Sequence, residues 1–334
     1  YNYTLSYGGC SNTQNVTVII KPTPAVVLPG NLEFCHRDAA PAVVFTGPVP
    51  GTSFSWTNSN PAIGLAASGT GNLPAFTATN TGTSPVSAII SVRTAANGCQ
   101  GVNSTFSITV FPESNGGLVS PDASVCGGAN SGTVNLSAYV GNIQRWQSSI
   151  DGGTTWTDIT NATASYTYTN LVTTTLLRAV IKSGICSDDY SSSAMITVND
   201  ASVGGTVSSD QAVCYGSNNG TLTLSSYNGT VQKWQSSVNG GITWTDINTT
   251  TNTLTYNNLS LTTQYRAIVK SGACPVVNSS VATITVDPVS VGGTVSGSTT
   301  VCSGSNSGTL TLTGHTGNVV KWQSSTDGGT TWAD

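Results

Sequence analysis

A repeat of 88 residues constrains the fold of this chain more than any other feature of its sequence. Within the 334 residues, two complete copies and part of a third follow one another without an insertion. The residues that recur at this step are Cys126, Cys214 and Cys302, then Trp146, Trp234 and Trp322, and then Trp156, Trp244 and Trp332. A propeller blade has roughly 40–50 residues, whereas a copy of this length can close a hydrophobic core of its own. The repeat therefore predicts consecutive autonomous domains.

Alternating apolar and polar residues within each copy predict short β-strands. In the second copy, for example, Leu222 and Leu224 alternate with threonines. Such segments, separated by Gly, Asn and Ser clusters about every 8–12 residues, indicate an antiparallel β-sandwich of about seven strands. The links between copies, 199–203 and 287–291, are short. We therefore expect an all-β chain of tandem sandwiches joined into an elongated rod.

The composition supports this fold class and disfavours several kinds of protein. Only 7% of the residues are charged, the formal net charge is −4, and 37 residues are glycine. A nucleic-acid-binding protein needs clustered Lys and Arg, and surface helices usually present Glu, Lys and Arg to water. No segment approaches the roughly 20 apolar residues that a membrane-spanning helix requires. We expect neither a nucleic-acid partner nor a membrane span in this sequence.

The first third of the chain is similar to the repeats in style but not in sequence. Its strand-like segments include Phe54–Pro61 and Phe106–Val110, and it contains a single tryptophan, Trp56. The five expected parts are the last two strands of a truncated sandwich at 1–22, a complete sandwich at 24–113, complete repeats at 116–199 and 204–287, and the N-terminal half of a third repeat at 292–334. Both terminal parts are therefore expected to be incomplete modules.

The eight cysteines suggest one disulfide bond within each sandwich. Each complete module has an early and a late cysteine, 60 residues apart in the repeats and 64 apart in the first sandwich. The expected pairs are Cys35 with Cys99, Cys126 with Cys186 and Cys214 with Cys274, with Cys10 and Cys302 unpaired. Each bond is expected to join loops at one end of its sandwich and to contribute about 4 kcal/mol through chain entropy. A metal site is the alternative, but no CxxC motif is present. Disulfides would place the chain in an oxidising, extracellular compartment.

A tight hairpin recurs in each copy. Ser149–Trp156 resembles the Asp-box turn, Ser-x-Asp-x-Gly-x-Thr-Trp, of sialidases and other β-propellers. In this turn a short Asp or Asn bonds its own backbone, and the tryptophan packs on the base of the hairpin. The structural residues expected in the three turns are Asp151 and Trp156, Asn239 and Trp244, and Asp327 and Trp332. Sialidase chemistry would need clustered arginines, whereas Arg145, Arg178 and Arg266 occupy isolated strand positions.

Calcium is an alternative role for the recurring acidic residues. The candidate pairs are Asp151 with Asp158, Asn239 with Asp246, and Asp327 with Asp334. Calcium prefers six to eight oxygen ligands, including several carboxylates. The turn explains the first residue of each pair without a metal, so no metal site is expected.

The tryptophans divide into two groups. Those that we expect in the cores are Trp56, Trp146, Trp234 and Trp322. The hairpin tryptophans are expected to pack within their hairpins, with stacking on sugars as the alternative.

Catalytic residues are not apparent. His36 and His315 are the only histidines, and His315 replaces tyrosines of the other copies. Glutamate occurs only at Glu33 and Glu113, and no paired carboxylates or phosphate-binding loop are visible. We expect no enzymatic activity and no cofactor.

Several segments resemble a known group of bacterial surface proteins. Phe54–Gly64, Gly71–Asn80 and Asn97–Cys99 resemble the PKD-like domains of giant Bacteroidetes surface proteins. The 88-residue copies, with Gly220–Leu224 and Trp234–Ser237, are similar to Ig-like repeats of the same proteins. The resemblance implies export by the type IX secretion pathway and a role as a cell-surface adhesin, including gliding-motility adhesins, or as an extracellular filament.

The expected function is thus a non-catalytic extracellular stalk or adhesin region, because near-identical copies extend length without adding chemistry. Its expected partners are the neighbouring modules of the same chain, with self-association into fibres or binding of surface glycans as further possibilities. The alternative is an array of weak glycan- or protein-binding modules that gains strength from multivalency. A third reading, an accessory region of an enzyme, would require a catalytic domain elsewhere.

Overall fold

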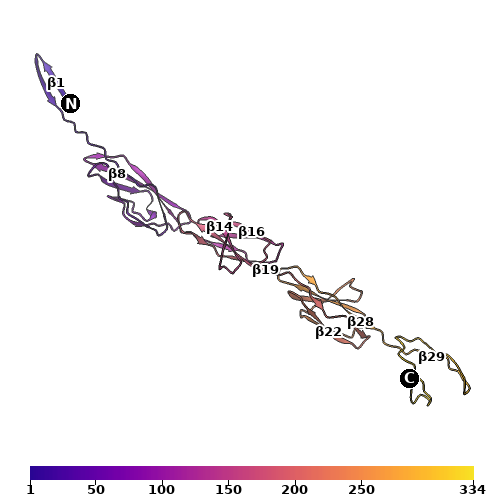
Figure 1. Cartoon of the computed structure of the whole chain (residues 1–334). Coiled ribbons are helices and arrows are strands. Elements are labelled where there is room, and N and C mark those ends of the chain that lie inside the picture. The colour runs from indigo at the N-terminus through magenta and orange to yellow at the C-terminus, as the bar shows by residue number, and fades with distance from the viewer. The chain divides into compact units, whose positions relative to one another are not determined.

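The computed structural model describes residues 1–334 and contains thirty β-strands and one short 3-10 helix (Figure 1). The strands form three complete β-sandwiches with a small sheet at each end of the chain. The prediction of an all-β chain of tandem sandwiches is therefore confirmed. The chain divides into two compact units, one comprising Tyr1–Ala123 and Ala129–Val198 and the other comprising Ser124–Gly128 and Asn199–Asp334.

The first sandwich spans the dissimilar N-terminal region. Its elements are β3 (Leu32–Cys35), β4 (Ala39–Ala40), β5 (Ser53–Asn58), η1 (Pro61–Ile63), β6 (Ser68–Thr70), β7 (Phe76–Thr77), β8 (Val86–Ala96), β9 (Cys99–Gln100) and β10 (Ser104–Phe111). The larger sheet has the order β3-β10-β8-β5-β6, with β9 paired to β8, and β4 pairs with β7. The indole of Trp56 lies in the core of this sandwich among Ile90, Val92 and Ile108.

The second sandwich is the first complete repeat. Its strands are β11 (Leu118–Ser120), β12 (Ala123–Cys126), β13 (Ser131–Ser137), β14 (Asn142–Ser149), β15 (Thr157–Ile159), β16 (Ser165–Thr169), β17 (Thr175–Lys182), β18 (Asp189–Tyr190) and β19 (Ala194–Asn199). A three-stranded sheet, β11-β13-β16, faces a larger sheet, β12-β19-β17-β14-β15, in which β18 pairs with β17.

The third sandwich repeats this topology. Its strands are β20 (Thr206–Val207), β21 (Gln211–Cys214), β22 (Asn219–Ser225), β23 (Thr230–Ser237), β24 (Thr245–Ile247), β25 (Thr253–Asn257), β26 (Thr263–Lys270), β27 (Val277–Asn278) and β28 (Ala282–Asp287). The sheet orders are β20-β22-β25 and β21-β28-β26-β23-β24, with β27 paired to β26. Identical sheet orders follow from the sequence repeat.

Period-2 alternation buries one face of each strand. In β22, Leu222 and Leu224 are buried while the threonines between them are exposed. Trp234 of β23 is fully buried, and it lies opposite Ala267 of β26. A bulge in β23 between Val231 and Lys233 shifts the register ahead of this tryptophan, which explains why the alternation in the sequence is imperfect there.

A glycine beneath a tyrosine fixes the pairing within the smaller sheets. Gly132 of β13 lies opposite Tyr168 of β16, and Gly220 of β22 lies opposite Tyr256 of β25. A Cβ atom on either glycine would lie 2.3 Å from the tyrosine hydroxyl. Because no side chain fits there, the aromatic ring can lie flat over the neighbouring strand.

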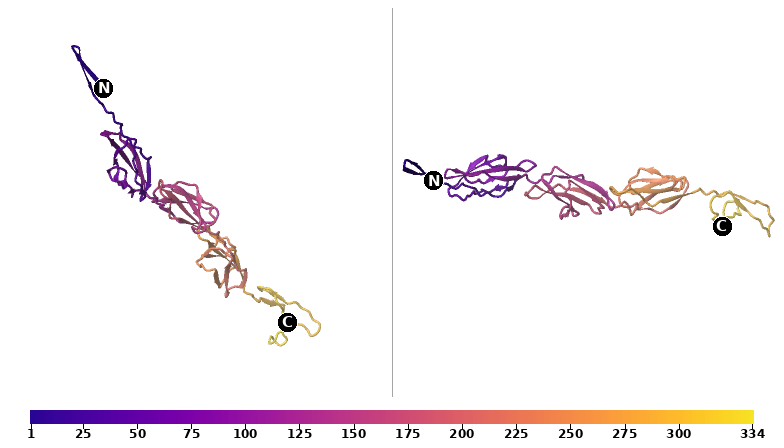
Figure 2. Two further views of the ribbon diagram at one scale, coloured as in Figure 1. Left: turned by 60° about the vertical axis from the view of Figure 1, so that its left-hand side comes forward. Right: turned by 90° about the horizontal axis from the view of Figure 1, so that it is seen from above.

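One strand pair in the larger sheets of the first and third sandwiches departs from the expected antiparallel arrangement. The first strand of the sheet runs parallel to the last, so that Cys35 of β3 lies beside Phe111 of β10, and Cys214 of β21 lies beside Asp287 of β28. In both views of Figure 2 the chain enters each sandwich at one end and leaves it at the other. The early cysteine therefore lies at the exit end of its sandwich, next to the last strand.

Each terminal part of the chain contains a two-stranded sheet. Residues 1–22 contain the hairpin of β1 (Asn2–Tyr7) and β2 (Cys10–Asn15), and residues 292–334 contain β29 (Thr294–Ser296) paired with β30 (Thr311–Thr313). The prediction that Trp322 lies in a core is wrong, because its side chain is 50% exposed. No second sheet covers its indole in residues 292–334.

Candidate functional site

Two disulfide bonds join consecutive sandwiches and are the most distinctive chemical feature of the chain. Cys35 of the first sandwich bonds to Cys186 of the second, and Cys126 of the second bonds to Cys274 of the third. The Cα atoms are 5.3 Å and 4.6 Å apart, which is ordinary disulfide geometry. The prediction of one bond within each sandwich is therefore wrong.

The direction of the strands explains the correction. An early cysteine ends a strand that runs parallel to the last strand, so it lies at the exit end. A late cysteine such as Cys274 follows β26, which runs antiparallel to β28 and therefore ends at the entry end. Sequence spacing placed the two cysteines of a module at one end, whereas the topology places them at opposite ends. Only cysteines of consecutive modules can meet.

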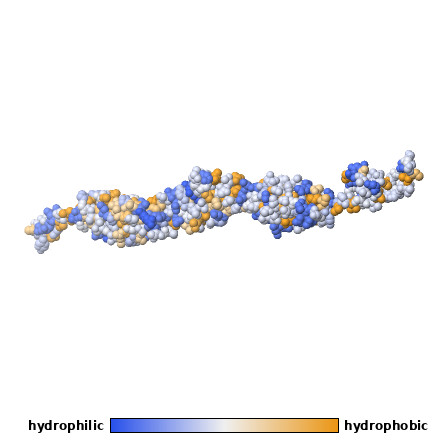
Figure 3. Space-filling view, turned by 90° about the horizontal axis from the view of Figure 1, so that it is seen from below, coloured by the Kyte–Doolittle hydropathy of each residue, from blue (hydrophilic) through white to orange (hydrophobic).

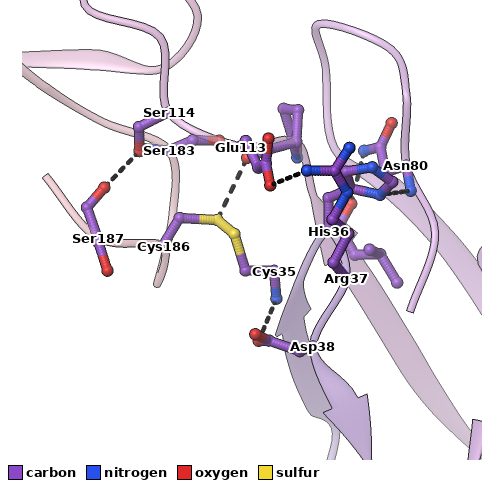
Figure 4. The surroundings of a disulfide bond; sticks show 12 residues. Cys35, His36, Arg37, Asp38, Asn80, Glu113, Ser114, Ser183, Cys186 and Ser187 are labelled. Carbon is purple, nitrogen blue, oxygen red and sulfur yellow. Dashed lines mark hydrogen bonds and ion pairs between the residues drawn. A yellow bond between two sulfur atoms is a disulfide. The ribbon is translucent and has the colours of Figure 1, made fainter. Parts of the chain in front are cut away.

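The surroundings of the first bond tie the two sandwiches together (Figure 4). The Sγ of Cys186 lies 3.2 Å from the carbonyl oxygen of Pro112, the residue directly after β10. Ser114 bridges back to the second sandwich, because its hydroxyl donates to the carbonyl of Ser187 at 2.7 Å and accepts from the backbone N–H of Ser183 at 2.9 Å. The cystine is thus one part of a polar junction.

The same junction contains a close apolar contact. A Cβ atom on Gly184 would lie 2.3 Å from the ring of Phe111, the last residue of β10. The glycine precedes Cys186 by two residues, and Cys186 is only 4% exposed. The ring therefore covers the turn that carries the late cysteine, and the sulfur is shielded from water.

The second bond lies in an equivalent arrangement with a polar residue in the place of the phenyl ring. The side-chain carbonyl of Asn199 accepts hydrogen bonds from the hydroxyl of Ser124 at 2.7 Å and from the N–H of Ala273 at 3.0 Å. A Cβ atom on Gly272 would lie 2.3 Å from Cγ of Asn199. The Sγ of Cys274 lies 3.2 Å from the carbonyl oxygen of Asp200. In both junctions, the late cysteine therefore packs against the chain that leaves the preceding sandwich.

Four cysteines are free: Cys10, Cys99, Cys214 and Cys302. The predicted bonds of Cys99 to Cys35 and of Cys214 to Cys274 are wrong because both partners are bonded across junctions. Cys10 and Cys302 were expected to be unpaired, and both are exposed.

The recurring hairpin has the hydrogen bonds of an Asx-type turn. Asp151 accepts from the N–H of Thr155 at 3.0 Å and from its hydroxyl at 2.5 Å, and the hydroxyl of Ser149 donates to Asp151 at 2.7 Å. The hydroxyl of Thr155, its N–H and the hydroxyl of Ser149 hold the pKa of Asp151 well below its usual range. The indole N–H of Trp156 donates to the carbonyl of Gly153 at 2.9 Å. The carboxylate therefore organises the turn.

The other two hairpins repeat these contacts. Asn239 accepts from the N–H of Thr243 at 2.9 Å, so an amide replaces the carboxylate without loss of the turn. Asp327 accepts from the N–H of Thr331 at 2.9 Å, and the threonine hydroxyl and N–H lower the pKa of this aspartate. Trp332 remains 60% exposed.

Two of the arginines stack on aromatic rings, which the sequence-based interpretation did not include. The guanidinium of Arg178 lies between two rings, 3.8 Å from the centroid of Trp156 and 4.1 Å from that of Tyr190. Arg266 lies 4.0 Å from the centroid of Trp244. The signal that could have revealed this stack was the constant spacing of 22 residues between tryptophan and arginine in both repeats.

A row of polar contacts continues from each stacked arginine. The Nε of Arg178 donates to Gln147 at 2.9 Å, and Gln147 donates to Asp158 at 2.7 Å. Gln147 and then Arg145 lower the pKa of Asp158. The carboxylate proposed as a calcium ligand is therefore already hydrogen-bonded. No group of three or more His, Cys, Asp or Glu residues is arranged to hold a metal ion.

The remaining predicted residues are dispersed. Trp146 is fully buried and its indole N–H donates to the carbonyl of Thr163 at 3.0 Å. The Nδ1 of His36 accepts from the N–H of Asn80 at 2.9 Å. His315 is exposed in the C-terminal part. The contacts of Trp146 and His36 are structural.

The surface is weakly charged and patchy. On the face shown in Figure 3, apolar side chains form small separate groups among polar ones. None of the helical segments is long and apolar enough to cross a membrane.

Comparison with known families identifies the repeats. Residues 115–200, 203–288 and 291–334 match the family described as "Domain of unknown function (DUF8696)", and together they make up more than half of the chain. The chain belongs to the DUF8696 family. No curated protein matches it.

Several solved structures of tandem Ig-like domains are similar to the chain. Domains A168–A170 of titin have 15% sequence identity over 78% of this chain and 97% of that one, with a TM-score of 0.35. The three N-terminal domains of the bacteriophage RB49 Highly Immunogenic Outer Capsid protein have 13% identity over 79% and 99%, with a TM-score of 0.40. Immunoglobulin domains 1–5 of Sidekick-1 have 11% identity over 84% and 64%, with a TM-score of 0.37.

Proposed function

We propose that this DUF8696 region is a non-catalytic stalk of an extracellular surface protein or filament, in which cystines restrain the angle between consecutive sandwiches. The observation that carries the proposal is that both disulfides cross a junction between modules. A bond within a module would stabilise that module alone, whereas a bond across a junction adds a second covalent connection beside the peptide link. Such a pair of connections resists bending and twisting.

An extracellular location is part of the proposal. Disulfides persist in oxidising compartments, and the low charge and high content of Thr, Ser, Asn and Gly suit an exposed all-β protein. The resemblance to Bacteroidetes adhesins, type IX secretion and self-association into fibres remain predictions of the sequence.

The covalent part of the proposal can be tested by cutting the peptide link. A protease recognition sequence inserted after Ala201 lies in the link between the second and third sandwiches. After cleavage, the two fragments should stay together as one species of about 34 kDa without reductant, and should separate into fragments of roughly 20 and 14 kDa on reduction. Cys274→Ser should separate them without reductant, whereas Cys214→Ser should not. Separation of the oxidised native chain would contradict the proposal.

The mechanical part needs a measurement of shape. Small-angle X-ray scattering of the oxidised chain should give a longer and narrower distribution of interatomic distances than that of the reduced chain, because the peptide link alone permits more orientations. Equal distributions would show that the cystines do not restrain the junction.

A multivalent binding array is the second candidate, and the hairpin tryptophans are its candidate platforms. Guanidinium groups already cover one face of Trp156 and of Trp244, which leaves less aromatic surface for a sugar. A glycan array probed with the native chain and with Trp156→Ala/Trp244→Ala separates the two candidates. Saturable binding that is lost in the variant would favour the array.

A further inference from the structure

The early cysteine of the third sandwich is free, although its two counterparts are bonded. Cys35 and Cys126 form disulfides to the following sandwich, whereas Cys214 is an exposed thiol. The three positions can be compared directly, because they belong to the same strand of the same sheet order.

The backbone around the three cysteines is equivalent. The N–H of the residue after each early cysteine donates to the last residue of the final strand, at 2.9 Å in every case. These bonds run from His36 to Phe111, from Gly127 to Asn199 and from Tyr215 to Asp287. The register agrees, because Cys214 lies beside Asp287 as Cys35 lies beside Phe111. The backbone therefore holds the thiol of Cys214 in the same way as it holds the sulfurs of Cys35 and Cys126.

The chain that leaves the third sandwich also supplies the surface that a late cysteine contacts. In the two formed junctions, the late sulfur lies 3.2 Å from the carbonyl of the residue after the final strand, which is Pro112 or Asp200. In the third sandwich, Pro288 occupies this position after β28. The third sandwich thus presents the same backbone position that a late cysteine contacts in the two formed junctions.

The late cysteines that contact this position in the two formed junctions share a sequence pattern. Both late cysteines follow a positive-φ glycine by two residues, Gly184 before Cys186 and Gly272 before Cys274. Each glycine lies beneath the last residue of the preceding sandwich, where a Cβ atom would clash. A turn of the form Gly-x-Cys at the entry end of a DUF8696 sandwich therefore fits against Pro288 in the same way.

We propose that Cys214 is half of a third cystine across a junction, and that its partner is the late cysteine of a DUF8696 sandwich that follows the third one. The cystines then form a ladder in which every early cysteine bonds to the late cysteine of the next module. The inference deepens the proposed function, on which it rests. Oxidation removes two protons and two electrons from the two thiols, and a small disulfide such as oxidised glutathione accepts them and is reduced to two thiols.

The chain's own third sandwich provides a matched partner for the test. In the first variant, a second copy of residues 203–288 replaces residues 291–334, which preserves the 88-residue period. In the second variant, residues 247–288 are copied after Asp334, which corresponds to Asp246, and complete the existing half-repeat. Each variant is refolded in oxidised and reduced glutathione, and its disulfides are mapped by mass spectrometry of peptides without reduction.

The ladder predicts that the copied Cys274 bonds to Cys214 in both variants, and that this bond is lost in Cys214→Ser while Cys302→Ser retains it in the second variant. A bond between the copied Cys274 and the early cysteine of its own module would overturn the inference, and so would a free copied thiol in the first variant, whose added sequence is that of a complete sandwich. Either result would leave the two observed bonds intact. Failure of the proposed function would instead appear as fragment separation in the protease experiment.

Discussion

The overlap of the two disulfide loops makes a quantitative prediction for the chain under tension. Cys126 lies inside the loop closed by Cys35 and Cys186, so the shortest covalent path runs backwards through the second sandwich. It covers about 155 residues, against 334 for the reduced chain. At roughly 3.5 Å per extended residue, the disulfides of the oxidised chain should shorten its fully extended contour length by about 180 residues, or ~60 nm.

Single substitutions distinguish the observed pairing from pairing within modules. In Cys126→Ser the path is diverted through the remaining bond between Cys35 and Cys186, and only about 30 more residues, or ~10 nm, should be exposed. Bonds within modules would release about 60 residues, or ~20 nm, for the same substitution. Cys214→Ser is the matched control and should leave the length unchanged, because its thiol is free.

The assay is single-molecule force spectroscopy of the chain held by its two ends, in oxidising and reducing buffer. The total contour length after all sandwiches have unfolded is compared between the native chain and the two variants. An increase of ~20 nm for Cys126→Ser, or any increase of that size for Cys214→Ser, would refute the pairing across junctions.

Three further predictions concern the sandwiches themselves. Trp234→Ala should destabilise the third sandwich by about 3–5 kcal/mol because the indole is fully buried, whereas Trp322→Ala, at a half-exposed indole, should cost under about 0.5 kcal/mol in the same urea titration. The pKa of Asp151 lies below its reference value of 3.8, so the stabilisation of the first hairpin by the ionised carboxylate is complete above that pH and is lost as the pH falls towards the folded pKa. Hydrogen exchange at the Thr155 amide should therefore accelerate on acidification relative to the second hairpin, and Asp151→Asn should remove this difference. Arg178→Lys should cost roughly 0.5–1 kcal/mol in thermal unfolding because an ammonium cannot stack between two rings, and an unchanged midpoint would contradict the role of the stack.

Much of the fold could be predicted because the relevant information is local. The period of 88 residues marks equivalent positions, and alternation within segments such as β22 marks the buried face. The position of Trp322 could not be obtained in this way. Burial depends on a second sheet, and residues 292–334 do not form one.

The disulfide pairing was not predictable from spacing, because a separation along the chain says nothing about which end of a sandwich a residue occupies. That depends on strand direction, and the parallel pairing of β21 with β28 reverses the expected end. The stack of Arg178 on Trp156 was missed for a related reason, since the two residues meet only through the pairing of β14 with its neighbours. Both errors concern contacts between distant segments.

The location of the early cysteine at the exit end has a consequence for biosynthesis. The partner of Cys35 lies 151 residues further along the chain, so a newly folded module must keep a reactive sulfhydryl until its successor has matured. Only a correctly assembled successor consumes that group. Residual reactivity of Cys35 or Cys126 towards an alkylating dye would therefore report a folding defect in the module downstream of the labelled residue.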